Sequence, residues 1–228
     1  MTIFRFSLKR VFHSPLNLLL VCVLPVGAAF LPSSAGWPVP IGFHMYGAIL
    51  LFAAFLMLRS VIEDAASGVL QRIGAAPVSH FRYLWETLLA YAVILVIQNA
   101  VMVVLGVVIH GERIRSPFLL FTAYTVFSLT ALAISLAGGS LFRNRDAAYG
   151  SLGGALIFLA MLGGFFWPME IMPPALKRAA MATPCYWLVE AAQTLQQDGS
   201  PGHFALCLAV MLLWTIALLL VGSRRRMT

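Results

Sequence analysis

The sequence predicts an all-α integral membrane protein that forms a single domain over residues 1–228. Hydrophobic residues make up 61% of the chain and charged residues only 10%, whereas a soluble domain has about 25% charged residues. Five or six apolar segments approach or exceed the roughly 20 residues that an α-helix needs to cross a bilayer. Charged residues are concentrated between these segments, so we expect six transmembrane helices joined by short connections.

The first 14 residues predict an amphipathic helix that lies in the membrane interface. Arg5 and Lys9 stand four residues apart, so they share one helical face, and apolar residues alternate with the basic ones. A basic tail without regular structure is the alternative. We expect no cleaved signal peptide, because the following apolar segment lacks a small-residue cleavage signature before Pro32.

Six predicted spans then follow in order. Pro25 should kink the first span, because proline removes a backbone hydrogen bond from a helix. Trp37, in the connection after it, and Trp85, at the start of the third span, are typical interfacial anchors. The spans cover residues 15–31, 41–58, 83–109, 117–142, 147–167 and 204–221.

Residues 168–201 break this regular alternation. Pro168, Pro173, Pro174 and Pro184 interrupt the segment, yet residues 175–181 and 186–195 remain apolar or amphipathic. A free loop would not carry so much apolar surface. We therefore expect short helices that dip back into the membrane, where protein shields any irregular backbone.

The distribution of Lys and Arg predicts the orientation. Cytoplasmic loops carry an excess of these residues. With the N-terminus inside, eleven lie on the cytoplasmic side and four outside, so both termini and the polar segment 59–80 should be cytoplasmic, and residues 168–201 extracellular. The outer four are Arg113, Arg115, Lys177 and Arg178; the inner eleven are Arg5, Lys9, Arg10, Arg59, Arg72, Arg82, Arg143, Arg145, Arg224, Arg225 and Arg226.

Polar residues inside the spans are candidates for a transport path. Gln98 and Asn99 fall near mid-bilayer, where helix–helix hydrogen bonding is favoured over ligand contact by about two to one. Thr122, Thr125 and Ser128 form a hydroxyl stripe that either lines a path or bonds back to its own helix carbonyls. In the fifth span, Gly150 and Gly154 make a small-residue face suited to packing within one chain or between two chains.

Several chemistries are absent from the sequence. Neither lysine follows a Gly-x-x-x-x-Gly, so the chain has no phosphate-binding P-loop for ATP. The three cysteines and five histidines are too scattered for a metal site, and no nucleophile–base pair suggests a catalytic site in the spans. The net charge of +7 is typical of basic cytoplasmic loops and gives little support to nucleic-acid binding. We expect a non-enzymatic chain that holds no cofactor.

Three motifs together resemble a known family. They are VIEDAASGVLQR at 61–72 with PVS at 77–79, LFRNRD at 141–146, and GGFFWPMEIMPPAL at 163–176 followed by TPCYWLVE at 183–190. Their order and spacing across the whole chain are similar to those of the membrane-spanning permease subunits of type-2 ABC exporters. One difference is Val69-Leu70-Gln71, where family members often have Thr-Leu-Glu.

This resemblance implies a mechanism and partners. The region 59–80 would hold a coupling helix that docks in a groove of a separate ATPase subunit, which itself binds ATP and Mg²⁺. Residues 1–14 would form the elbow helix, and two permease chains, identical or related, would pair through their first and fifth spans. The docking residues would be Glu63, Asp64, Gly68, Arg72 and Pro77.

The expected function is export through the plasma or inner membrane, powered by that ATPase. The mostly apolar spans favour an amphiphilic cargo such as a drug, an antibiotic or a lipid-like molecule, and a polysaccharide or a peptide is the alternative. A membrane scaffold, or a transporter or channel that does not use ATP, is the alternative function.

Overall fold

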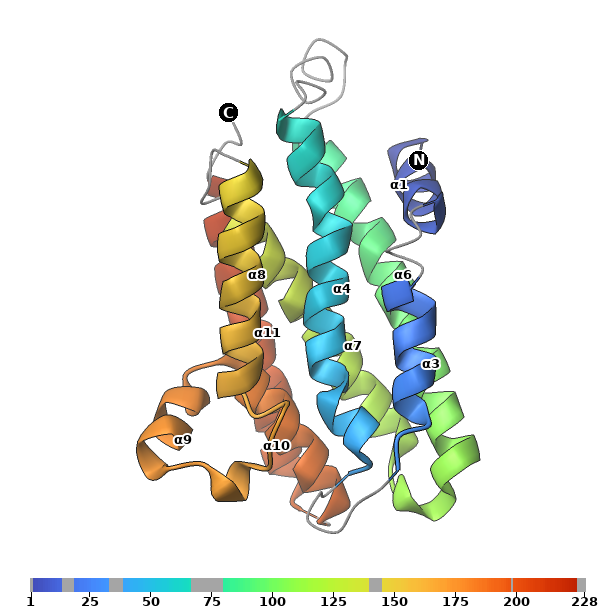
Figure 1. The fold of residues 1–228 in the computed structure, drawn as a ribbon, viewed down its shortest axis with the longest axis vertical. Helices are drawn as coiled ribbons and strands as arrows, with labels where there is room; N and C mark the ends of the chain where they lie inside the picture. The colour runs from blue at the N-terminus through green and yellow to red at the C-terminus, as the bar shows by residue number, and fades with distance from the viewer. Residues whose placement is uncertain are drawn as a thin grey trace.

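The structure is a computed structural model that describes residues 2–13, 19–32, 39–66, 80–139, 145–197 and 199–224. All regular secondary structure in these ranges is helical (Figure 1), which confirms the all-α part of the predicted fold class. The elements are α1 (Thr2–His13), η1 (Leu19–Val23), α3 (Leu24–Ala29), α4 (Ile41–Ala66), α6 (His80–His110), η2 (Gly111–Arg113), α7 (Pro117–Gly139), α8 (Arg145–Leu162), η3 (Met169–Ile171), α9 (Pro174–Met181), α10 (Pro184–Gln196) and α11 (Pro201–Arg224).

Four of the described helices are long and apolar enough to cross a membrane. The apolar stretches are Ile41–Arg59, Trp85–His110, Pro117–Gly139 and Pro201–Val221, which correspond to the second, third, fourth and sixth predicted spans. The described part of the first predicted span is a short π-helical turn followed by α3, and Pro25 lies in the first turn of α3. The complete six-span arrangement therefore stays a prediction.

The helix α8 ends earlier than the sequence predicted. The expected fifth span reached residue 167, whereas α8 stops at Leu162. Gly164 adopts a φ of 82°, a left-handed conformation that glycine reaches without steric cost. The Nε2 of His44 in α4 lies 2.6 Å from the Gly164 carbonyl oxygen, so this turn is held against the start of the second span.

The helix α7 occupies the centre of the bundle, where it packs against α4, α6, α10 and α11. Its side chains Tyr124 and Phe127 are fully buried. The Tyr124 ring meets Tyr46 of α4 edge to face, with centroids 4.8 Å apart, and Phe127 meets Phe165 in the same way at 5.7 Å. Such aromatic contacts fix the helices relative to one another.

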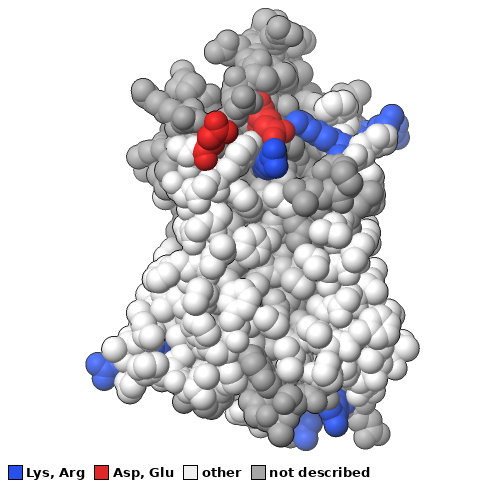
Figure 2. All heavy atoms as spheres, in the orientation of Figure 1, with Lys and Arg blue, Asp and Glu red and all other residues white. Residues whose placement is uncertain are grey.

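The two ends of the bundle differ from its middle. Figure 1 places both termini at the same end of the bundle, one at α1 and the other beyond the end of α11, and places α9 and α10 at the opposite end. On the face drawn in Figure 2, charged side chains gather at the two ends and leave an uncharged band between them. This distribution is that of a protein whose middle lies in hydrocarbon.

Candidate functional site

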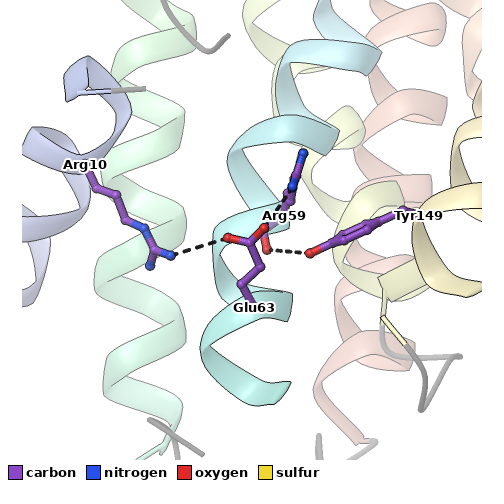
Figure 3. A network of polar contacts seen from close by, with 4 residues as sticks. All are labelled: Arg10, Arg59, Glu63 and Tyr149. Carbon is purple, nitrogen blue, oxygen red and sulfur yellow. Dashed lines mark hydrogen bonds and ion pairs between the residues drawn. The ribbon is translucent and has the colours of Figure 1, made fainter. Parts of the chain in front are cut away.

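A polar network joins three helices at the end that carries both termini (Figure 3). The Nε of Arg59 donates a hydrogen bond to Oε1 of Glu63, one turn later in α4, at 2.8 Å. The other carboxylate oxygen of Glu63 lies 3.8 Å from Nη2 of Arg10 in α1. From α8, the Tyr149 hydroxyl donates to the Arg59 carbonyl oxygen at 3.4 Å, and its ring lies 5.0 Å from the Arg59 guanidinium. We call these four residues the Glu63 network.

The Glu63 network orients helices more than it stabilises them. The side chains of Arg59 and Glu63 are 46% and 37% exposed, and exposed ion pairs contribute only about 0–1 kcal/mol each. The network does connect three helices, α1, α4 and α8, so it helps to set their positions relative to one another. The Arg59–Glu63 spacing of four residues was visible in the sequence, but the positions of Arg10 and Tyr149 were not.

The helix α1 has a second attachment, to α6. The backbone N–H of Phe4 donates to Oε2 of Glu86 at 3.3 Å, and the Ser7 hydroxyl donates to the Thr87 hydroxyl at 3.4 Å. On its other side α1 leaves Phe6 66% exposed. The predicted N-terminal helix is therefore confirmed as a helix, with polar contacts to α4 and α6, and its position in the membrane interface stays a prediction.

The predicted coupling region 59–80 begins inside α4. Residues 59–66 continue the helix beyond its apolar stretch, so Glu63 and Asp64 are rigidly continuous with the second span. The side chain of Asp64 is not among the described ones. Gly68, Arg72 and Pro77 lie outside the described residues.

A buried polar cluster joins α4, α6 and α7. The Tyr46 hydroxyl donates to Oδ1 of Asn99 at 2.9 Å, and Nδ2 of Asn99 donates to the Ser128 hydroxyl at 2.9 Å. Ser128 in turn donates to the carbonyl oxygen of Tyr124, in its own helix, at 2.7 Å. Asn99 is completely buried. The interpretation of Asn99 as a helix–helix contact agrees with this geometry, in which Tyr46 was the partner that sequence reasoning missed.

The other candidate path residues differ from Asn99. Gln98 is 2% exposed, and neither atom of its amide forms a well-aligned hydrogen bond, although it lies near the Tyr46 hydroxyl. The buried Thr125 hydroxyl also lacks a partner in the described structure. Thr122 donates to the Phe118 carbonyl oxygen in its own helix at 2.9 Å. The predicted hydroxyl stripe therefore has no single role in this conformation.

A comparison with protein families matched residues 39–224 to the ABC-2 family transporter proteins. The chain belongs to the ABC-2 transporter family. This assignment makes it a permease, the membrane-spanning transport component of an ABC transporter, and such components are normally non-catalytic. It also implies a partner ABC ATPase and a multi-pass membrane setting. A search of curated proteins found no match to the chain.

The glycines of α8 in this ABC-2 permease are open to the outside of the subunit. A Cβ atom added at Gly150, Gly153 or Gly154 would meet no atom within 4 Å. By contrast, a Cβ at Gly47 in α4 would lie 2.4 Å from the Phe165 ring. Of the two interpretations of the small-residue face, packing within one chain therefore finds no support among the described contacts.

Short helices follow α8 at the opposite end of the permease, as predicted for residues 168–201. They are η3, α9 and α10, and α10 packs against α7 and α11. Oε1 of Glu190 lies 3.1 Å from Nε2 of His203 in α11, and Nε2 of Gln196 donates to the Arg113 carbonyl oxygen at 2.9 Å. The short helices are confirmed, and their re-entry into the membrane stays a prediction. Among the described residues, no cluster of His, Cys, Asp and Glu is suited to a metal ion.

Proposed function

We propose that this chain is the permease subunit of an ATP-driven ABC exporter. The observation that carries the proposal is the continuity between α4 and the predicted coupling region. One helix contains both a membrane-crossing stretch and Glu63, so a force applied at Glu63 would act directly on a transmembrane helix. Membership of the ABC-2 family supports the same function.

In this proposal the partner ATPase binds ATP and Mg²⁺ and docks at the end that carries both termini, which faces the cytoplasm. Glu63, Asp64, Gly68, Arg72 and Pro77 would form the docking segment. The Glu63 network would pass the movement on to α1 through Arg10 and to α8 through Tyr149. The helices α1, α4 and α8 would then move together when the ATPase pair closes.

Two permease chains would enclose the path between them, pairing through the first predicted span and α8. The open glycine face of α8 supports this arrangement, because small residues let helix backbones approach closely in a membrane. Beside that face, Phe158 is 66% exposed. Gly150→Leu with Gly154→Leu should reduce cross-linked dimer in membranes, whereas Val108→Leu, at an exposed position of α6, should not. Unchanged dimer in the glycine variant would contradict this pairing.

The cargo we propose is amphiphilic, of the drug, antibiotic or lipid-like class. The described spans carry few charged side chains that could bind sugar or phosphate, and apolar sites bind ligands with few polar groups. Gln98 and Thr125 would offer polar contacts if the helices part. A polysaccharide or a peptide is the alternative cargo. The ATPase would dock at the same end of the permease, and the vesicle assay would then show transport of that cargo instead of an amphiphilic one.

The test is ATP-dependent transport in proteoliposomes that contain the permease and its co-expressed ATPase. The purified chain alone should hydrolyse no ATP. Glu63→Lys with Asp64→Lys should lower ATPase co-purification at least fivefold, because it reverses two charges of the docking segment. Glu112→Lys, in η2 at the opposite end, is the matched charge-reversal control. Unchanged docking would contradict the coupling role, and transport without ATP would favour the alternative function.

A further inference from the structure

An apolar groove lies between α6 and α11 on the surface of α7. The helices α6 and α11 each pack along α7 but make few contacts with each other, so the space between them is left open. Its volume is about 420 Å³, within the range of pockets for one small molecule. Leucines of α7 form the floor, side chains of α6 that include Trp85 and Ala92 form one wall, and side chains of α11 that include Thr215, Leu219 and Leu220 form the other.

The lining offers apolar contacts almost exclusively. Thr215 carries one of its few polar groups, and its hydroxyl already donates to the Met211 carbonyl oxygen and lies 2.9 Å from the Thr130 hydroxyl. An unfilled groove would forfeit dispersion contacts along both walls. The helices that form the groove are long and apolar enough to cross a membrane, so an acyl chain is the ligand that matches its chemistry.

The groove lies at the end of the bundle that carries both termini. Trp85 is 58% exposed and precedes Glu86, the residue that bonds to α1. Leu219 and Leu220 stand in the last two turns of α11. An amphipathic indole at this level is typical of the lipid headgroup region, so the mouth of the groove is where a headgroup would lie.

Basic residues stand in the sequence just beyond the groove residues of α6 and α11. In α6, Arg82 precedes Trp85 by one turn, and in α11, Arg224 follows Leu220 by four residues. Arg225 and Arg226 come next in the sequence. Basic clusters next to the end of a membrane helix attract anionic lipid headgroups. The sequence therefore supplies positive charges next to the ends of both walls, beyond an apolar slot.

We propose that this groove binds one anionic phospholipid, with an acyl chain along α7 and its headgroup beside the basic ends of α6 and α11. A second permease copy is disfavoured as the occupant, because the open glycines are on α8 and α8 contributes nothing to the groove. The site does not depend on the proposed coupling mechanism. Its test uses lipid binding alone, so either proposal can fail without the other.

The experiment titrates the detergent-purified permease with phosphatidylglycerol or phosphatidylcholine and counts retained lipids by native mass spectrometry. We expect one phosphatidylglycerol per chain, with at least fivefold preference over phosphatidylcholine. Ala92→Trp, which fills the groove, should lower this occupancy at least fivefold. Ala205→Trp, at an exposed position of α11 outside the groove, should leave it unchanged.

A charge series tests the headgroup separately. Arg82→Gln with Arg224→Gln should remove the preference for phosphatidylglycerol, whereas Arg113→Gln with Arg115→Gln, at the other end, should retain it. Equal occupancy in Ala92→Trp and Ala205→Trp, or a preference unaffected by Arg82 and Arg224, would overturn the proposal. So would conversion of a dimer to a monomer by Ala92→Trp, because the groove would then be a protein interface.

A second measurement uses the wild-type chain, so it does not depend on whether Ala92→Trp folds. Phosphatidylglycerol with brominated acyl chains should quench the Trp85 fluorescence, because bromine in the groove would lie next to the indole. The quenched fraction should fall in Trp85→Phe and should exceed that obtained with brominated phosphatidylcholine. Equal quenching by the two lipids in the wild-type chain would also overturn the proposal.

Discussion

The Tyr46 hydroxyl and the Asn99 side-chain oxygen are 2.9 Å apart and both residues are fully buried. This hydrogen bond crosses from α4 to α6, and the same Asn99 continues to Ser128 of α7. One amide therefore links three helices of the bundle. Its role in this conformation is structural.

Replacement of Asn99 should accordingly destabilise the fold. Asn99→Leu leaves the Tyr46 hydroxyl without its acceptor, and the free energy of unfolding should fall by roughly 1–2 kcal/mol. Asn99→Leu removes two hydrogen bonds between helices, whereas Ser128→Ala removes only the one from Asn99, so Ser128→Ala should cost less. Denaturation in detergent measures both. A double-mutant cycle with Tyr46→Phe should show coupling between positions 46 and 99, and purely additive effects would contradict the link.

Replacement of Gln98 should not destabilise the fold, although Gln98 is next to Asn99 in the sequence. Its buried amide forms no well-aligned hydrogen bond, so Gln98→Leu should leave the free energy of unfolding unchanged or raise it. If Gln98 contacts cargo during transport, the same variant should lose ATP-driven efflux in proteoliposomes. Normal stability with normal efflux would exclude Gln98 from the path. Asn99→Leu serves as the comparison, because a loss of efflux in that variant would be accompanied by a lower free energy of unfolding.

Two glycine-to-alanine substitutions should act in opposite directions. Gly47→Ala places a methyl group 2.4 Å from the buried Phe165 ring, and such overpacking costs about 1–3 kcal/mol. Gly154→Ala meets no atom within 4 Å, and a monomer in detergent should gain up to about 1 kcal/mol from the better helix former. Thermal unfolding followed by circular dichroism distinguishes them. A loss of stability in monomeric Gly154→Ala would show that α8 packs differently.

The cysteines provide a direct test of burial. Cys22 is exposed, whereas Cys185 and Cys207 are buried. Burial also raises the pKa of the Cys185 thiol to about 12, so it stays protonated, and only the thiolate reacts readily. The folded chain in detergent at pH 7 should take up about one maleimide, and Cys22→Ser should remove that reactivity. Labelling should reach all three thiols only after denaturation, and two or more labelled thiols in the folded state would contradict the packing of α10 or α11.

The sequence predicted features that depend on local pattern. The apolar stretches within α4, α6, α7 and α11 were located to within a few residues, because hydrocarbon requires a continuous apolar helix whatever its neighbours are. The short helices of residues 168–201 were expected for a similar reason, since proline placed their starts and their apolar surface required burial. For Gln98 and Asn99 alike, the sequence favoured helix–helix hydrogen bonding over ligand contact, and only Asn99 forms such bonds.

Tertiary structure alone decided which residues meet. Glu63 was expected to face a partner protein, and the structure adds Arg10 and Arg59 as its intramolecular contacts. Arg10 stands more than fifty residues from Glu63 in the sequence, so no local spacing could reveal the pair. The outward direction of Gly150 was equally undetermined, because a small-residue motif is the same whether its face is covered or open. Sequence determined which segments are helical and apolar, and packing decided which of their faces remain available to other molecules.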